Sequence, residues 1–236
     1  DLLARLREAS GDRIGSFELL PRVAVELAAR HVEGVVAPLG LESPWYLLCE
    51  LGSSRADEGL HVLLERELAA ALDAGLASDA TLANSERERL AFWRLRESIP
   101  EAQTREGASL KHDISVPVAR LPEFIERAGR WIEEHVEGAI LVAYGHVGDG
   151  NLHFNLSQAQ GATTGALKAQ EAAIRRAIHD LVREFDGSFS AEHGIGRLKV
   201  GELERYAPPL ELELMRAVKR AFDPHGIMNP GKVLHA

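Results

Sequence analysis

Apolar residues recur every three or four positions along much of the chain, which is the spacing of one buried face of an α-helix. This spacing predicts helices over residues 2–9, 17–32, 59–76, 85–99, 121–136, 167–185 and 210–222. Shorter apolar or alternating stretches predict strands over residues 45–51, 80–82, 112–117, 139–147 and 151–156. Helices and strands therefore alternate through most of the sequence.

Two successive passes of strand, helix and strand, with antiparallel return strands, indicate a split βαβ arrangement. We expect an α+β fold of ferredoxin-like split βαβ repeats, in which a mostly antiparallel sheet is covered by helices on one side. Residues 1–40 are expected to form an N-terminal helical segment or linker, 41–160 an α+β substrate or cap domain, and 161–236 a helical C-terminal part.

The stretch 144–155 predicts a β-hairpin, because Asp149-Gly150 between two alternating segments is typical of a type I′ turn. Counting outward from that turn places His146 directly opposite His153. Opposed residues have Cβ atoms about 4.5–5.5 Å apart, so both imidazoles could bind one metal ion at about 2.0–2.1 Å. We interpret both histidines as metal ligands; the alternative is a pair of solvated or hydrogen-bonded sheet residues.

The two faces of this hairpin carry different residue types. Tyr144 and Asn155, predicted to lie opposite each other, share the face of the two histidines. The other face carries apolar side chains that suit a core: Val147, Leu152, Phe154 and Leu156. One face is thus predicted to pack and the other to carry chemistry.

A second polar motif, residues 190–196, is predicted to be a loop, because Gly194 and Gly196 allow close backbone approach. Glu192 is the candidate third metal ligand. Adjacent residues of an extended segment point in opposite directions, so His193 is free to act as a base or a substrate contact. The alternative is that Glu192 caps a helix and that His193 is exposed.

The composition narrows the functional classes. A chain of 236 residues with 45% hydrophobic residues can bury one sizeable core, and a formal net charge of −9 argues against a nucleic-acid surface. No apolar run is long enough for a membrane span. The one cysteine, Cys49, lies in an apolar run and cannot form a disulfide within the chain, which suits a reducing compartment and a cytoplasmic location. Peripheral membrane attachment of a longer form stays open.

Three motifs together resemble the C-terminal domain of FAD-linked oxidases. They are residues 146–153, residues 192–196 and the terminal stretch 228–234. This family is similar to the D-2-hydroxyacid dehydrogenases of the vanillyl-alcohol-oxidase type, which include D-lactate dehydrogenase, D-2-hydroxyglutarate dehydrogenase and the flavoprotein subunit of glycolate oxidase. The resemblance covers nearly the whole chain, and it implies oxidation of a 2-hydroxyacid to a 2-oxoacid by hydride transfer to flavin.

The resemblance also implies a flavin-binding domain before this region. The chain begins at Asp1, and its glycines do not fit the dinucleotide fingerprint spacing. We therefore expect a fragment that lacks most of the FAD site and is inactive alone. The C-terminal part is expected to return toward the flavin-binding domain, with Asn229 as a cofactor contact.

The family further implies roles for residues that the pattern alone leaves open. An arginine in a helix is more often solvated or ion-paired, but Arg96 and Lys111 fall where the family holds the carboxylate groups of its substrate. Asn155 would orient the substrate, and His193 would take the hydroxyl proton. The D-2-hydroxyglutarate enzymes are expected to place a threonine hydroxyl where this chain has Pro100, so lactate, glycolate, malate or a longer hydroxyacid stay open.

In this interpretation His146, His153 and Glu192 hold a divalent cation with an open position for substrate oxygens. Zinc suits the three ligands best, and manganese or iron would accept them. One alternative is a metal-dependent hydrolase or lyase without flavin. Another is a non-catalytic ferredoxin-like module with structural histidines. The electron acceptor stays open, as does a homodimer.

Overall fold

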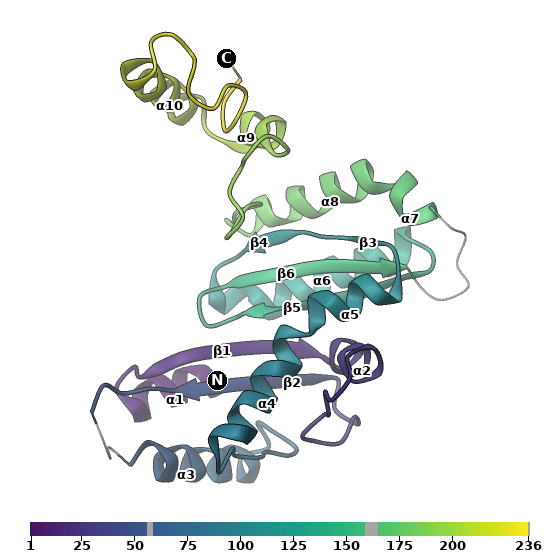
Figure 1. Cartoon of the computed structure of the whole chain (residues 1–236), viewed down its shortest axis with the longest axis vertical. Coiled ribbons are helices and arrows are strands. Elements are labelled where there is room, and N and C mark those ends of the chain that lie inside the picture. Colours follow the sequence, from purple (N-terminus) through teal and green to yellow (C-terminus); the bar gives the residue numbers. More distant parts are fainter. Residues whose placement is uncertain (56–58, 159–164, 236) are drawn as a thin grey trace.

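The computed structural model describes residues 1–55, 59–158 and 165–235, and its centre is an antiparallel six-stranded sheet (Figure 1). The strand order is β2-β1-β5-β6-β3, and β4 also pairs with β6. The strands are β1 (Ile14–Pro21), β2 (Trp45–Leu51), β3 (Ser109–Leu110), β4 (Asp113–Ser115), β5 (Ala139–His146) and β6 (Asn151–Gln158). The expected α+β fold with a mostly antiparallel sheet is confirmed.

The helices account for most of the remaining described chain. They are α1 (Leu2–Ser10), α2 (Arg22–His31), α3 (Leu60–Asp73), α4 (Glu86–Glu97), α5 (Ile99–Glu106), α6 (Leu121–His135), α7 (Ala166–Ala169), α8 (Glu171–Glu184), α9 (Val200–Tyr206) and α10 (Pro209–Phe222). A short 3₁₀ helix, η1 (Val118–Arg120), precedes α6.

The expected helix over 17–32 is wrong in its first part, because residues 14–21 form β1. Pro21 explains the difference: proline in a helix clashes with the carbonyl four residues earlier, and it disfavours helical geometry at the preceding residue. Pro21 has an extended φ of −72° and ψ of 153°, and α2 begins at Arg22. Residues 1–40 therefore supply a strand that lies between β2 and β5, and they are not a purely helical segment.

Three smaller expectations also differ from the structure. Residues 80–82 do not form a strand. The helix expected over 85–99 ends at Glu97, and a separate helix, α5, follows with Pro100 in its first turn. The strand expected over 112–117 is reduced to β4, and α9 was not expected.

Apolar clusters lie on both faces of the sheet, whereas the sequence predicted helices on one side. On one face Phe154 packs against α6, where the rings of Phe124 and Phe154 meet edge to face at 5.5 Å between centroids. On the other face Val142 and Tyr144 pack against apolar residues of α2, α4 and α5. The sheet is thus enclosed by helices, and side chains alternate between two cores.

The register of the β5–β6 hairpin differs from the expected one by two residues. Tyr144, not His146, lies opposite His153, and Val142 lies opposite Asn155. The side-chain period of a strand is two, so this shift leaves every side chain on its expected face. His146 and His153 are diagonal neighbours with ring centroids 6.1 Å apart.

The shift arises because residues 147–150 form a longer loop instead of a two-residue type I′ turn. Of Asp149 and Gly150, Gly150 alone has a positive φ, 87°. The Asp149 carboxylate accepts a hydrogen bond from the backbone N–H of Asn151 at 3.0 Å, which closes an Asx turn. A Cβ at Gly150 would lie 2.1 Å from the carbonyl oxygen of Val116, so glycine is required there.

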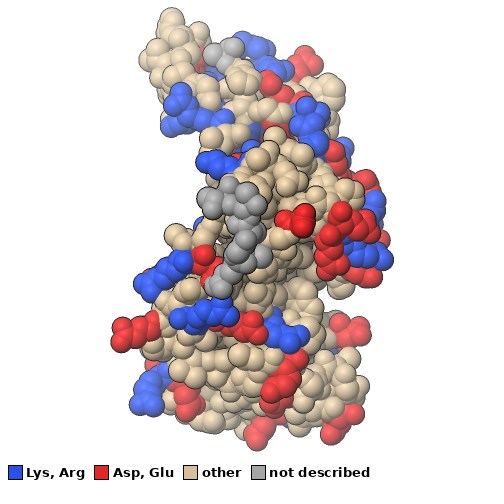
Figure 2. All heavy atoms as spheres, turned by 90° about the vertical axis from the view of Figure 1, so that its right-hand side faces the viewer, with Lys and Arg blue, Asp and Glu red and all other residues tan. Residues whose placement is uncertain are grey.

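The helices α9 and α10 form an arm that projects away from the sheet (Figure 1). Leu203, Leu212 and Leu234 make its small apolar cluster. No helix in the described ranges is both long and apolar enough to cross a membrane. On the face shown in Figure 2, basic and acidic side chains are interspersed.

The core packing predicts a large loss of stability for Phe124→Ala. Phe124 is 0% exposed, and truncation of a buried phenylalanine costs about 3–5 kcal/mol through lost burial and the cavity left behind. Phe222→Ala is the control, because Phe222 is 79% exposed and should change the free energy of unfolding by less than about 0.5 kcal/mol. Urea unfolding of both variants tests the assignment, and equal losses would contradict it.

Candidate metal and substrate site

His146, His153 and Glu192 converge beside the turn of the β5–β6 hairpin. Each offers one ligand atom, and these atoms lie within 4.8 Å of one another. The His146 Nε2 atom lies 3.1 Å from Glu192 Oε1. Two ligands bound tetrahedrally at 2.0–2.1 Å are about 3.3 Å apart, so this donor set fits one small divalent cation.

The convergence joins two motifs far apart in the chain. His146 and His153 come from neighbouring strands, while Glu192 lies in the loop between α8 and α9. That the motif 190–196 is a loop is confirmed by the structure. Two nitrogen donors and one carboxylate are a set found in catalytic zinc sites that keep an open position.

The electrostatic surroundings of His153 favour a neutral imidazole. Burial lowers its pKa, and the positive charge of Arg96 lowers it further, whereas Glu192 and Asp113 act in the opposite direction. The net pKa lies below the ordinary value for histidine. A neutral ring carries the lone pair that a metal ligand needs.

Glu18 of β1 connects His146 with Arg96. The residue is 1% exposed and lies opposite His146 across the β1–β5 pair. Oε1 accepts a hydrogen bond from His146 Nδ1 at 2.5 Å, and Oε2 accepts one from Arg96 Nε at 2.7 Å. The other ring nitrogen of His146, Nε2, faces Glu192.

The Arg96 guanidinium bonds to the protein through its Nε atom. Its Cζ atom lies 5.0 Å from the centre of the Tyr144 ring, and the residue is 7% exposed. Nε donates to Glu18, but neither Nη atom donates a hydrogen bond to another described residue. Nη groups that have no acceptor among the described residues are suited to a carboxylate ligand, which a guanidinium can hold with two parallel hydrogen bonds.

Asp113 of β4 anchors the loop that carries Glu192. Its Oδ2 atom accepts hydrogen bonds from the backbone N–H groups of Glu192 at 2.9 Å and His193 at 2.8 Å. Burial raises the pKa of Asp113, but these two N–H groups and nearby positive charge outweigh it, and the net pKa is lowered. Lys199 Nζ supports the same loop by donating to Ser190 Oγ at 3.1 Å.

His193 lies beside His153, with nearly parallel rings whose centroids are 6.1 Å apart. Its side chain is 67% exposed, and Nδ1 lies 3.4 Å from Asp113 Oδ2. The two neighbouring side chains are not directed apart, because residues 191–193 form a bend and ligand atoms of Glu192 and His193 lie within 4.8 Å of each other. The exposed imidazole is free to exchange a proton with a bound molecule.

Lys111 and Asn155 lie next to each other in register but differ in their surroundings. The pairing of Leu110 with Leu156 and of Asp113 with His153 places Lys111 opposite Asn155. Lys111 is exposed. Asn155 is buried and occupied within the protein: Oδ1 accepts from the His112 backbone N–H at 3.2 Å, and Nδ2 donates to Gln103 Oε1 at 3.0 Å.

Asn229 lies in the arm, not beside the two histidines. It is exposed, has a φ of 48°, and accepts a hydrogen bond at Oδ1 from Lys232 Nζ at 3.1 Å. The terminal motif does reach the site loop at one point, because the backbone N–H of Val233 donates to the Gly196 carbonyl at 2.7 Å. Two of the three motifs of the sequence are thus joined by a backbone hydrogen bond.

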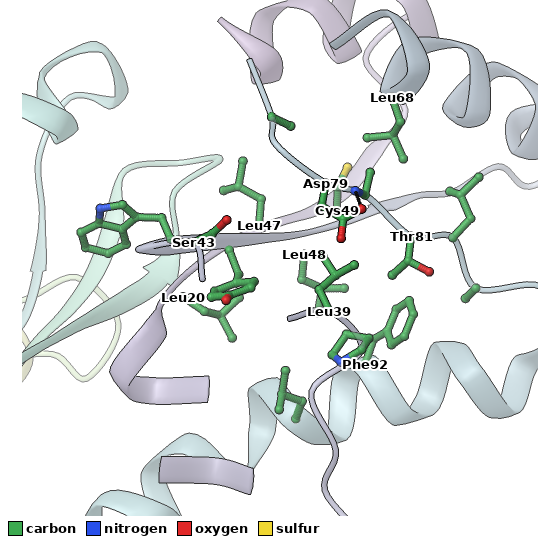
Figure 3. Close-up of a pocket in the computed structure, with 18 of the residues that line it drawn as sticks. Leu20, Leu39, Ser43, Leu47, Leu48, Cys49, Leu68, Asp79, Thr81 and Phe92 are labelled. Atoms are coloured by element: carbon green, nitrogen blue, oxygen red, sulfur yellow. Dashed lines mark hydrogen bonds between the residues drawn. The ribbon is translucent and has the colours of Figure 1, made fainter. Parts of the chain in front are cut away.

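A large apolar cavity of about 810 Å³ lies elsewhere, at the outer strand β2 (Figure 3). It lies among β2, α3, α4 and residues 76–83, and Leu48, Leu68 and Phe92 are part of its lining. The cavity contains none of the site residues predicted from the sequence. We take the polar cluster as the candidate site because it brings ligand atoms for one ion together near Arg96, whereas no such set of ligand atoms lies in the cavity lining among the described residues.

Sequence reasoning missed Glu18 and Asp113. Glu18 lay in a segment interpreted as helix, although Pro21 signalled that the helix begins later. Asp113 lies in the expected strand 112–117, and nothing local indicates that it bonds a loop some 80 positions further on. Both residues act through long-range contacts.

Comparison with known proteins identifies the family of this chain. The family model described as "FAD linked oxidases, C-terminal domain" matches residues 1–233. A relative named D-2-hydroxyglutarate dehydrogenase from Stutzerimonas stutzeri is 35% identical over 202 residues, which are 86% of this chain and 43% of the relative. The mitochondrial D-2-hydroxyglutarate dehydrogenase of Bos taurus is 37% identical over 97% of this chain and 40% of its own length.

The chain thus spans about two fifths of the length of the curated relatives it matches. Among solved structures, a 4-ethylphenol oxidase from Gulosibacter chungangensis superposes with a TM-score of 0.56 at 14% identity. That match covers 99% of this chain and 51% of the other. At this identity it supports the fold alone.

The role of Asp113 predicts a local effect of Asp113→Ala. Hydrogen bonds to a charged acceptor contribute on the order of 1.5–3 kcal/mol each, so the amides of Glu192 and His193 should exchange at least about tenfold faster. Hydrogen exchange followed by NMR at neutral pH measures this. In the unsubstituted protein the protection should persist below the ordinary aspartate pKa of about 3.9 and be lost as pH falls through the lowered folded-state pKa.

Asp223→Ala is the matched control, because Asp223 also accepts two backbone N–H groups, from Ile227 at Oδ1 and from Met228 at Oδ2, both at 2.9 Å. It should accelerate exchange at residues 227 and 228 only. Unchanged exchange at 192 and 193 in Asp113→Ala would remove the anchoring role.

Proposed function

The chain belongs to the family of FAD-linked oxidase C-terminal domains, and we propose that it is the substrate- and metal-binding part of an FAD-dependent D-2-hydroxyacid dehydrogenase or oxidase. The observation that carries this proposal is the convergence of His146, His153 and Glu192 beside Arg96, whose Nη groups have no acceptor among the described residues. A 2-hydroxyacid presents a hydroxyl and a carboxylate on neighbouring carbons. The site offers a place for each.

A divalent cation, when bound, supplies an open coordination position for the hydroxyl and carboxylate oxygens and lowers the pKa of the hydroxyl. The three ligand atoms fit such an ion by their spacing and by their chemistry. Arg96 then holds a carboxylate through its Nη edge, and the exposed Lys111, between β3 and β4, adds a positive charge. Asn155 supports this arrangement through its bonds to Gln103 and the β3–β4 connection.

His193 is the group that takes the hydroxyl proton. Its imidazole is exposed, lies beside His153 and has Asp113 near Nδ1, which leaves Nε2 facing away from that carboxylate. FAD, when bound, accepts the hydride from C2. The chain spans only about two fifths of these relatives, which leaves room for a separate domain that binds the flavin, and Asn229 in the arm is proposed to contribute to that contact.

The substrate class is proposed from the site and from the names of the relatives. Several relatives are named D-2-hydroxyglutarate dehydrogenase, which makes D-2-hydroxyglutarate the first substrate to test. Pro100 is exposed at the start of α5, one turn after Arg96, and has no hydroxyl to donate. D-lactate, glycolate and malate therefore remain in the tested set.

Two alternatives are less well supported. A hydrolase or lyase would use the same cation without a flavin, but the family match over residues 1–233 favours the flavin-linked reaction. A non-catalytic module would not account for a nearly buried guanidinium with unoccupied donors. Zinc is the cation that we propose, because two imidazoles and one carboxylate suit it. A cytoplasmic location is proposed from the single free cysteine, Cys49.

We predict that the protein binds about one zinc ion through these three side chains. Titration calorimetry and elemental analysis should show the ion in the wild type and its loss in His146→Ala, His153→Ala and Glu192→Gln. His135→Ala is the matched control, because His135 is exposed and stacks on Trp131 away from the cluster. Equal zinc content in all five proteins would refute the site.

A second prediction separates Glu192 from His193 in the full-length enzyme. Glu192→Gln removes a ligand, so added cation should restore part of the activity. His193→Ala removes a proton acceptor, so turnover should fall on the order of 10²–10⁴-fold and added cation should not restore it. Turnover on the preferred D-2-hydroxyacid is measured across a metal titration. Rescue of His193→Ala, with Glu192→Gln remaining inactive, would require the two roles to be exchanged.

A further inference from the structure

We propose that Glu18 is the positioning residue of this site, which fixes the tautomer of His146 for cation binding and orients Arg96 for carboxylate binding. The inference rests on the proposed function and deepens it. Glu18 itself touches neither the cation nor the substrate. It acts through two residues that do.

Glu18 is buried between its two partners in the fold. It lies in the middle of β1, directly opposite His146 of β5, and α4 brings Arg96 to its other oxygen. At 1% exposure the residue has almost no access to bulk water, so these partners must satisfy its carboxylate. The hydrogen bonds of 2.5 Å and 2.7 Å do so.

The bond to Glu18 determines which ring nitrogen of His146 carries the proton. A carboxylate oxygen accepts a hydrogen bond, so the Nδ1 atom of His146 donates and carries the proton. The lone pair of the neutral ring then lies on Nε2, the atom that is 3.1 Å from Glu192 Oε1. A histidine ligand whose other nitrogen donates to a carboxylate is a recurring arrangement at metal sites, where the carboxylate fixes the ring and raises its basicity.

Glu18 also fixes the orientation of Arg96. The bond from Nε to Glu18 and the contact with the Tyr144 ring fix the plane of the guanidinium. Both Nη groups are left for an incoming carboxylate. One buried side chain therefore orients both the Arg96 guanidinium and the His146 ring. These two groups must act on neighbouring groups of the same substrate.

Glu18→Gln is the informative variant, because it keeps the shape of the side chain. The Arg96 Nε–H needs an acceptor, so the amide oxygen should face Arg96 and the amide NH₂ should face His146. Nδ1 must then accept, which places the ring proton on Nε2. That tautomer cannot bind a cation through Nε2.

The experiment measures the tautomer and the zinc affinity of the wild type, Glu18→Gln and a control. Long-range ¹H–¹⁵N NMR of the metal-free proteins reports which ring nitrogen of His146 is protonated, with the signal assigned by its absence in His146→Ala. Competition titration with a zinc chelator reports affinity. The control is Glu202→Gln, because Glu202 Oε2 accepts from Nδ1 of the buried His179 at 2.7 Å, outside the cluster of ligand atoms.

The proposal predicts the proton on Nδ1 in the wild type, a shift to Nε2 in Glu18→Gln, and zinc affinity lowered about 10–100-fold. Glu202→Gln should leave both readouts at His146 unchanged. An unchanged tautomer in a folded Glu18→Gln, with affinity within twofold of the wild type, would overturn the proposal and leave the metal site standing. Unaltered zinc affinity in His146→Ala would instead overturn the proposed function, while the tautomer would still decide whether Glu18 orients the ring.

Discussion

A buried carboxylate that bonds two partners is the constraint on which this site depends. An unpaired charge in a protein interior is very unfavourable, so Glu18 is compatible with the fold only while His146 and Arg96 are in place. Those three residues come from β1, β5 and α4. The pairing of the strands and the docking of the helix therefore fix the direction of the two groups that face the ligand.

The rest of the site is assembled around β6, again through strand pairing and a buried carboxylate. His153 lies between Tyr144 of β5 and Asp113 of β4, so each neighbouring strand contributes one polar residue beside it. Asp113 then bonds the backbone of the loop that carries Glu192 and His193. A rigid sheet thus positions a loop that has no regular structure of its own, and the loop supplies the remaining ligand and the proton acceptor.

Much of the fold could be predicted from the sequence, because amphipathic periodicity identified most helices and the strands β2, β5 and β6. The turn of the hairpin was wrong, since Asp149 uses its side chain to close an Asx turn instead of adopting a positive φ. The predicted faces of the two hairpin strands were still right, because a register error of two residues leaves every side chain on the same face. Local pattern could not reveal Glu18, whose partner His146 is 128 positions away.

One cation is proposed to bind between the β5–β6 hairpin and the loop that carries Glu192. The most direct test is a crystal structure of the zinc-loaded protein with anomalous data collected at the zinc edge. The account predicts one strong anomalous peak, with His146 Nε2, a His153 ring nitrogen and a Glu192 oxygen each at about 2.0–2.2 Å. A fully loaded protein whose zinc peak lies elsewhere, with these three side chains uncoordinated, would contradict it.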